Sequence, residues 1–114
     1  GHLLELCRGS GVRAEIDVAA LPLIESVADY IAAGQMPGGT GRNLASYGRD
    51  LGEMSDFARA VVCDPQTSGG LLVAVRPEAA DEVADRLDEA GLHASSVGRL
   101  VEAGDGPLVV FDES

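Results

Sequence analysis

The chain has 114 residues, a length that suits one domain with a buried core. Its net charge of −11, from 19 acidic and 8 basic residues, makes nucleic acid or an anionic membrane an unfavourable partner. No apolar run approaches the roughly 20 residues of a transmembrane helix, and no signal-peptide pattern opens the chain, so we expect a cytoplasmic location.

The first third of the chain predicts a helix, a strand and a second helix. Residues 2–8 carry an apolar stripe that ends at a pair of glycines, as the tail of a helix does. Residues 12–18 alternate strictly between apolar and charged side chains, which predicts a half-buried strand. Residues 22–33 place apolar side chains at helical spacing, with Pro22 in the first turn and Gly34 as the C-terminal cap.

Regular patterns are weaker in the middle of the chain. Residues 35–55 are rich in glycine and predict a long irregular connection, in which a short helical turn at residues 44–47 is one option. Residues 57–63 fit either a short helix or a short strand. Residues 71–75 are all apolar, which predicts a strand buried on both faces.

The last third of the chain predicts a helix followed by a hairpin. Residues 77–90 carry an apolar stripe and an acidic and a basic residue four positions apart, and Gly91 suits the end of the helix. We expect residues 97–101 to pair with residues 108–111 around a turn that holds two glycines.

The order of these elements favours one α+β domain over residues 1–114. Helix, strand, helix, long loop, strand, helix, strand and strand together predict a mixed β-sheet with packed helices, in an α/β/α layered arrangement of partly ferredoxin-like character. The apolar fraction of 46% against 4% aromatics means that its core is built from aliphatic side chains.

The two cysteines are expected to be buried free thiols. Cys7 and Cys63 lack CxxC spacing, and each lies in an apolar stretch. His2 and His93 are the only imidazoles, so a zinc site would need widely scattered ligands, and we predict no metal site.

The segment from Asp64 to Leu72, with the sequence DPQTSGGLL, is the most informative stretch of the chain. It places an Asx/Pro turn, an amide, two hydroxyls and two glycines directly before the apolar run. The glycine pair lets the backbone approach a ligand or another chain closely. Asp-Pro and Ser-Gly pairs are also ordinary turn formers, so a purely structural turn is the alternative.

A second glycine-rich segment, MPGGTGRN at residues 36–43, has the composition of a phosphate-binding loop. Its glycines expose backbone N–H groups, Thr40 offers a hydroxyl, and Arg42 brings a guanidinium that matches a phosphate. The segment lacks the lysine of a Walker A motif and the third glycine of the dinucleotide fingerprint. A flexible surface loop is therefore the alternative interpretation.

Three segments together resemble the selenophosphate synthetases (selenide, water dikinases). DPQTSGGLL at residues 64–72 resembles a segment of that family, PGGTGRNL at residues 37–44 resembles its PGGTxRN loop, and GHLLE at residues 1–5 resembles the end of its TGFGLLGHLxE segment. The three matches occur in the family's order.

This resemblance implies the C-terminal domain of a larger enzyme, with the fold shared by aminoimidazole ribonucleotide (AIR) synthetase and its relatives. The family reaction converts ATP, selenide and water to selenophosphate, AMP and inorganic phosphate. The family's reactive Cys or selenocysteine, its lysine and its Mg²⁺- and ATP-binding aspartates belong to an N-terminal domain, which also forms most of the homodimer contact. None of these maps onto residues 1–114, so this chain alone is expected to be inactive, with no catalytic residue.

The resemblance also implies which residues face the cleft toward that N-terminal domain. The candidates to help close it around nucleotide or product phosphates are Thr40, Arg42, Asn43, Thr67, Ser68, Gly69 and Gly70. A purely architectural role in domain packing is the alternative. His2 as a general base and Asp64 as an acidic group are weaker candidates, because structural roles explain both.

Two other functions remain open from the sequence. AIR synthetase and a hydrogenase maturation protein that dehydrates a carbamoyl group share the expected fold, although QTSGG and GGTxRN favour the selenium enzyme. A stand-alone regulatory domain that binds a small molecule is an alternative from a different class.

Overall fold

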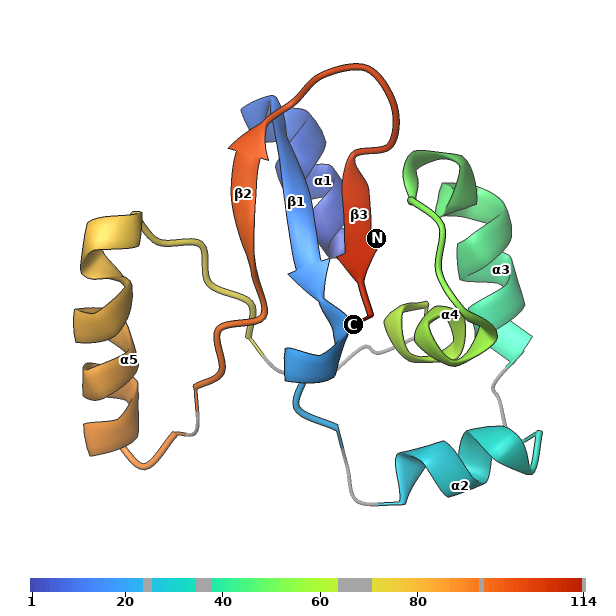
Figure 1. Cartoon of the computed structure of the whole chain (residues 1–114), viewed down its shortest axis with the longest axis horizontal. Helices are drawn as coiled ribbons and strands as arrows, with labels where there is room; N and C mark the ends of the chain where they lie inside the picture. Colours follow the sequence, from blue (N-terminus) through green and yellow to red (C-terminus); the bar gives the residue numbers. More distant parts are fainter. Residues whose placement is uncertain (24–25, 35–37, 64–70, 93, 114) are drawn as a thin grey trace.

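The computed structural model describes residues 1–23, 26–34, 38–63, 71–92 and 94–113 (Figure 1). In chain order, its helices, 3₁₀ turns and strands are α1 (His2–Ser10), β1 (Val12–Asp17), η1 (Val18–Ala20), α2 (Val27–Ala32), α3 (Gly38–Tyr47), η2 (Gly48–Asp50), α4 (Asp56–Val62), η3 (Pro77–Ala79), α5 (Ala80–Glu89), β2 (Gly98–Glu102) and β3 (Val109–Asp112). A mixed sheet combined with helices confirms the predicted α+β class.

The sheet has three strands in the order β2-β1-β3, with β1 antiparallel to β2 and parallel to β3. The predicted hairpin is therefore wrong, since the two last strands flank β1 instead of pairing with each other. Residues 103–108 pass over the start of β1 (Figure 1). The Arg13 guanidinium on β1 donates to the carbonyl oxygens of Asp105 at 2.6 Å and Pro107 at 2.9 Å. These bonds tie the crossing connection to the strand beneath it.

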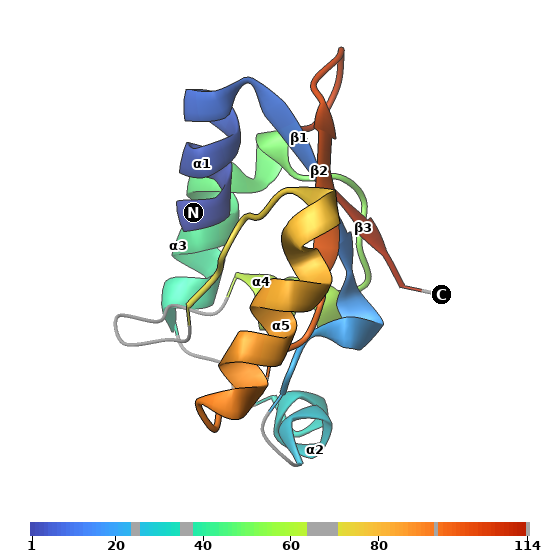
Figure 2. The same ribbon diagram turned by 90° about the vertical axis from the view of Figure 1, so that its left-hand side faces the viewer.

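The core lies between α1 and one face of the sheet. Leu4 and Cys7 from α1 are fully buried against Ala14 and Ile16 of β1 and Val109 of β3. The predicted first helix and the alternating strand are thus confirmed. Figure 2 shows α1 and α3 on the same side of the sheet.

Glycines fix two points of this arrangement. Gly11 ends α1 in the left-handed conformation, with a φ of 68°, and its N–H bonds to the Cys7 carbonyl. A Cβ at Gly98 would lie 2.0 Å from the Glu15 carbonyl oxygen, so only glycine permits the close contact between β1 and β2.

The irregular connection predicted over residues 35–55 is wrong at residues 38–50, which form α3 and η2, whereas residues 51–55 are irregular as predicted. The helical turn that the sequence offered at residues 44–47 lies within α3. Glycine is a poor helix former, but tertiary contacts outweigh that cost here. Tyr47 packs against the core, and the Asn43 amide donates to the Cys63 carbonyl at 2.8 Å. The helix is therefore anchored at its C-terminal half.

Residues 56–62, which the sequence left undecided, form α4. The Ser55 hydroxyl caps this helix by accepting from the Ala58 N–H at 3.1 Å. The Glu113 carboxylate accepts from both the Ser55 hydroxyl, at 2.5 Å, and the Ser55 N–H, at 2.8 Å. The residue after β3 is thereby joined to the start of α4.

The strand predicted at residues 71–75 is wrong. These residues form no strand and are exposed, with Leu71 at 89%. Both edges of β1 are occupied by β2 and β3. On the outer edge of β3, the Gly52 N–H donates to the Val109 carbonyl, and the Leu108 N–H just before the strand donates to the Asp50 carbonyl. Without a described strand beside it, the segment remains an exposed apolar run that leads into α5.

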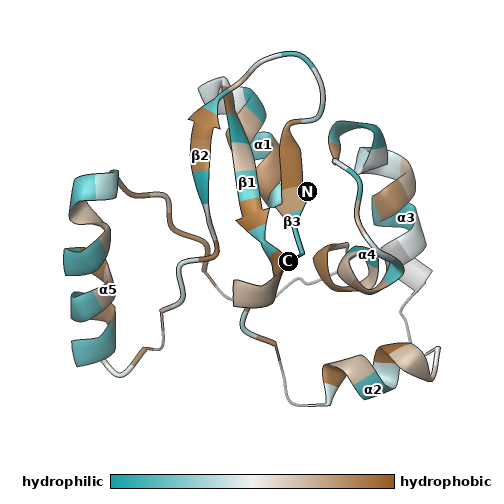
Figure 3. Cartoon of the chain, viewed as in Figure 1, coloured by the Kyte–Doolittle hydropathy of each residue, from teal (hydrophilic) through white to brown (hydrophobic). Residues whose placement is uncertain are grey.

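The predicted helix at residues 77–90 is confirmed as η3 and α5. The helix predicted at residues 22–33 is confirmed only as α2, and its predicted start is wrong, because Pro22 and Leu23 are not helical. In α5 the Arg86 guanidinium lies 3.1 Å from the Glu82 carboxylate, as expected. Hydrophilic residues dominate α5, which lies beyond the β2 edge of the sheet (Figures 1 and 3). Among the described helices, none has the length and apolar character needed to cross a bilayer.

Candidate functional site

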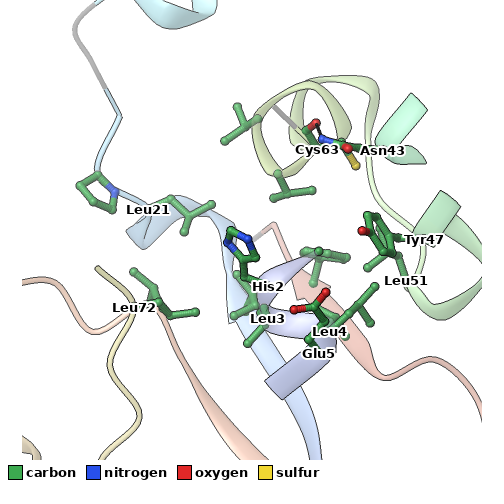
Figure 4. A pocket seen from close by; sticks show the side chains of 18 of the residues that line it. His2, Leu3, Leu4, Glu5, Leu21, Asn43, Tyr47, Leu51, Cys63 and Leu72 are labelled. Atoms are coloured by element: carbon green, nitrogen blue, oxygen red, sulfur yellow. Dashed lines mark hydrogen bonds between the residues drawn. The ribbon is translucent and has the colours of Figure 1, made fainter. Parts of the chain in front are cut away.

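A cavity of about 690 Å³ opens beside the core (Figure 4). Its walls come from α1, the end of β1, α3, α4 and the segment that begins at Leu71, and we term it the α1–α4 cavity. Most of the lining side chains are aliphatic. The polar side chains that reach it belong to His2, Glu5, Asn43 and Tyr47.

Helix geometry places these polar groups. His2 and Glu5 are three residues apart on the first turns of α1, and Asn43 and Tyr47 are four residues apart on α3, so each pair shares one helix face. A Cβ at Gly1 would lie 3.2 Å from the Tyr47 ring, which shows how closely the start of α1 approaches α3. The two helices therefore bring four polar side chains to one apolar cavity.

The Cys63 thiol lies in the cavity wall and is buried. Burial raises its pKa above the ordinary value of 9.0, and the positive charges of the N-terminus and Arg59 oppose that shift. Burial likewise raises the pKa of the Cys7 thiol. Both cysteines are buried and free, as predicted, and both are held in the protonated form that is a poor nucleophile and metal ligand.

No metal site emerges from the part of the chain that the structure describes. Nowhere in residues 1–23, 26–34, 38–63, 71–92 and 94–113 do three His, Cys, Asp or Glu side chains gather around a common point. The described residues by themselves therefore do not form a metal site with three or more such ligands.

The structure places three of the predicted site residues, Thr40, Arg42 and Asn43, within α3. Thr40 lies in its first turns, Arg42 is exposed, and Asn43 turns inward to the cavity and bonds to Cys63. The expected glycine loop is thus the beginning of a helix, so the N–H groups of its first residues are free of helical partners in the manner of any helix N-terminus. The structure does not bring Arg42 and Asn43 to one point.

The other predicted site residues lie outside the described part of the chain. These are Thr67, Ser68, Gly69 and Gly70, together with Asp64. His2 is exposed at the start of α1 and lines the α1–α4 cavity.

Sequence reasoning missed most of the cavity wall. Leu21 and Tyr47 line it, yet they are far apart in sequence and belong to no motif. The four-residue spacing of Asn43 and Tyr47 was one available signal, because it places both side chains on one face if residues 38–47 are helical. The glycines in this stretch are poor helix formers and therefore argued against that helix.

Comparison with known proteins identifies relatives over almost the whole chain. Residues 1–110 match the family described as "AIR synthase related protein, C-terminal domain". The chain is 50% identical over 110 residues to proteins named "Selenide, water dikinase" from Shigella flexneri and from Escherichia coli strain K12. Each alignment covers 96% of this chain and 32% of the relative, so the chain spans about a third of the length of these curated relatives.

Proposed function

The chain belongs to the AIR synthase related C-terminal domain family, and from this premise we propose that it acts as the C-terminal domain of a selenide, water dikinase. The observation that carries the proposal is the 50% identity across 96% of the chain. The three segments that resemble selenophosphate synthetases lie within the matched region. A protein of this kind is a phosphotransferase that makes selenophosphate from ATP, selenide and water.

In this proposal the phosphoryl-transfer machinery belongs to the amino-terminal part of the longer protein. ATP and Mg²⁺ would be bound mainly there, because the described residues hold no cluster of three acidic, His or Cys ligands and the net charge of −11 gives the chain no broad attraction for ATP. That part would also form most of a homodimer, and the whole protein would be cytoplasmic. This domain contributes one wall of the cleft.

The residues proposed to close the cleft do not have equal support. Arg42 is exposed on α3, so its guanidinium can donate hydrogen bonds to two oxygens of a phosphate and offset their charge. Asn43 already bonds to the Cys63 carbonyl, which favours the architectural role for that side chain. Thr40, Thr67, Ser68 and the Gly69-Gly70 backbone remain proposed phosphate contacts on the strength of the resemblance.

A domain exchange tests this function. The matching 110 residues of the Escherichia coli relative are replaced by this chain, and selenophosphate is followed by phosphorus NMR. We expect selenide-dependent ATP consumption by the hybrid and none by this chain alone. A hybrid that folds as its parent does but makes no selenophosphate would contradict the proposal, as would turnover by the isolated chain.

A second candidate is a stand-alone domain that binds a small molecule. It is favoured by the α1–α4 cavity, whose volume falls in the usual range of ligand pockets. Calorimetry of the isolated chain with ATP and Mg²⁺ discriminates between the two functions. Micromolar affinity without any other polypeptide would support the stand-alone domain, whereas its absence together with an active hybrid supports the dikinase domain.

A further inference from the structure

We propose that Asn43 is a positioning residue, which ties α3 to the residue from which the DPQTSGGLL segment continues. The proposed phosphate contacts belong to two segments that are separate in sequence, residues 37–44 and residues 64–72. This inference rests on the proposed function and deepens it, because it gives Asn43 a role in phosphate binding that needs no contact with the phosphate.

One hydrogen bond carries the inference. The Asn43 side-chain amide donates to the Cys63 carbonyl oxygen at 2.8 Å, and both residues lie at the α3 and α4 side of the cavity (Figure 4). Cys63 is buried and immediately precedes Asp64, the first residue of DPQTSGGLL. The bond therefore joins the helix that carries Thr40 and Arg42 to the start of the other segment.

The chemistry of the two groups explains why this position holds an asparagine. Cys63 directly follows the last residue of α4, and carbonyl groups at the end of a helix have no helical donor. Asparagine is a poor residue for the interior of a helix, so the local preference of α3 does not favour it. Its short amide supplies the Cys63 carbonyl with a donor and brings no charge.

The same bond helps to set the rotation of α3 about its axis. Asn43 and Tyr47 lie on one face of the helix, and Tyr47 packs against the core. Arg42 is turned by about 100° from Asn43 around the helix and is exposed. Loss of the Asn43 bond would therefore release both the direction of Arg42 and the position of Cys63.

Kinetics of the hybrid described above test the inference. Asn43→Ala should raise its KM for ATP at least about fivefold, because the proposed contacts are no longer held in place for the phosphates. Ser55→Ala is the matched control, since it removes a hydroxyl that caps the other end of α4 and leaves the Asn43 bond intact. Below the melting temperature of both variants, Ser55→Ala should leave the KM unchanged. Equal KM values for the two variants would overturn the inference.

A double-mutant cycle separates positioning from direct contact. In a background with alanine at Arg42, Thr67 and Ser68, Asn43→Ala should raise the KM by less than about twofold, because these side chains are no longer there to be positioned. Fold-changes that multiply would make Asn43 a phosphate contact in its own right and would contradict the positioning role.

Hydrogen exchange of the isolated chain gives a readout that does not depend on activity. The Cys63 N–H donates to the Arg59 carbonyl at 3.1 Å in the last turn of α4. Asn43→Ala should speed exchange of this amide at least about tenfold, whereas Arg42→Ala should leave it unchanged. Unchanged exchange in Asn43→Ala would refute the tie between the helices.

These outcomes distinguish the inference from the proposed function. An active hybrid whose KM does not respond to Asn43→Ala would refute the positioning role alone. An inactive hybrid would refute the proposed function and with it the phosphate role of Asn43, while the exchange of the Cys63 amide would still decide whether Asn43 ties α3 to α4.

Discussion

At the scale of single residues, a few side chains and glycines fix this fold. Arg13 holds the connection between β2 and β3 through two carbonyl oxygens, and Asn43 holds α3 to the end of α4. Gly98 allows β2 to approach β1, where any Cβ would clash with the Glu15 carbonyl. Arg13 and Gly98 lie outside the recognisable motifs, so their importance follows from contacts alone.

The close approach at Gly98 leads to a prediction about stability. Gly98→Ala should destabilise the chain by about 3 kcal/mol, because the added methyl group meets backbone atoms that cannot move aside without shifting a strand. Gly104→Ala is the control, since a Cβ there meets nothing within 4 Å. Urea unfolding followed by circular dichroism measures both. Equal midpoints for the two variants would show that the strands separate at little cost.

The Glu113 carboxylate gives a prediction about pH. Hydrogen bonds from the Ser55 hydroxyl and N–H hold the pKa of Glu113 below its ordinary value of 4.5. Because the pKa is lower in the folded chain, the ionised carboxylate stabilises the fold at pH values above its ordinary pKa. This stabilisation is lost as the pH falls through the lowered pKa. Glu113→Gln should therefore destabilise the chain at neutral pH, by an amount that shrinks as the pH is lowered through 4.5.

Thermal unfolding across this pH range checks the expectation for Glu113. The Ser55→Ala background serves as the control, because the hydroxyl partner is absent there and Glu113→Gln should have a smaller effect. A difference between the parent chain and Glu113→Gln that stays constant down to low pH would contradict the assignment.

At the scale of elements, packing decided where local patterns were ambiguous. Helix α3 forms from a glycine-rich sequence because Tyr47 packs on the core and Asn43 is anchored. Residues 71–75 have a strand-like sequence, yet they form no strand in the absence of a described neighbour. A strand needs a partner with free backbone groups, whereas a helix satisfies its own.

Helix α3 provides a prediction that separates architecture from binding. Asn43→Ala should destabilise the isolated chain by about 1–3 kcal/mol, because the partly buried Cys63 carbonyl loses its donor. Arg42→Ala removes an exposed side chain and should leave stability unchanged, but it should raise the KM of the hybrid for ATP. Chemical denaturation and steady-state kinetics measure the two effects. An unchanged KM for Arg42→Ala would remove that residue from the proposed phosphate contacts.

At the scale of the whole molecule, acidic and apolar side chains are concentrated in different parts of the domain. Acidic residues are concentrated on α5, beyond the β2 edge, while the lining of the α1–α4 cavity is aliphatic with one acidic residue among the described ones.

The sequence by itself determined the α+β class, the first helix, β1, the helix at α5 and the burial of both cysteines. Each of these depends on local periodicity or on residue type, which a short stretch of chain carries in full. The resemblance of three short segments also identified the family. Its proposed phosphate contacts remain predictions.

Only the tertiary structure decided the strand order, the helix over residues 38–47, the exposure of residues 71–75 and the cavity that joins Tyr47 to Leu72. These features depend on which surfaces meet across long sequence separations. The alternating pattern of β1 shows which face is buried, but it does not show which strands lie on either side. All segments compete for the same backbone partners and the same apolar surface, and the outcome sets the strand pairing and the cavity walls. A short stretch of sequence cannot show that outcome, because the competing segments lie far apart in the chain.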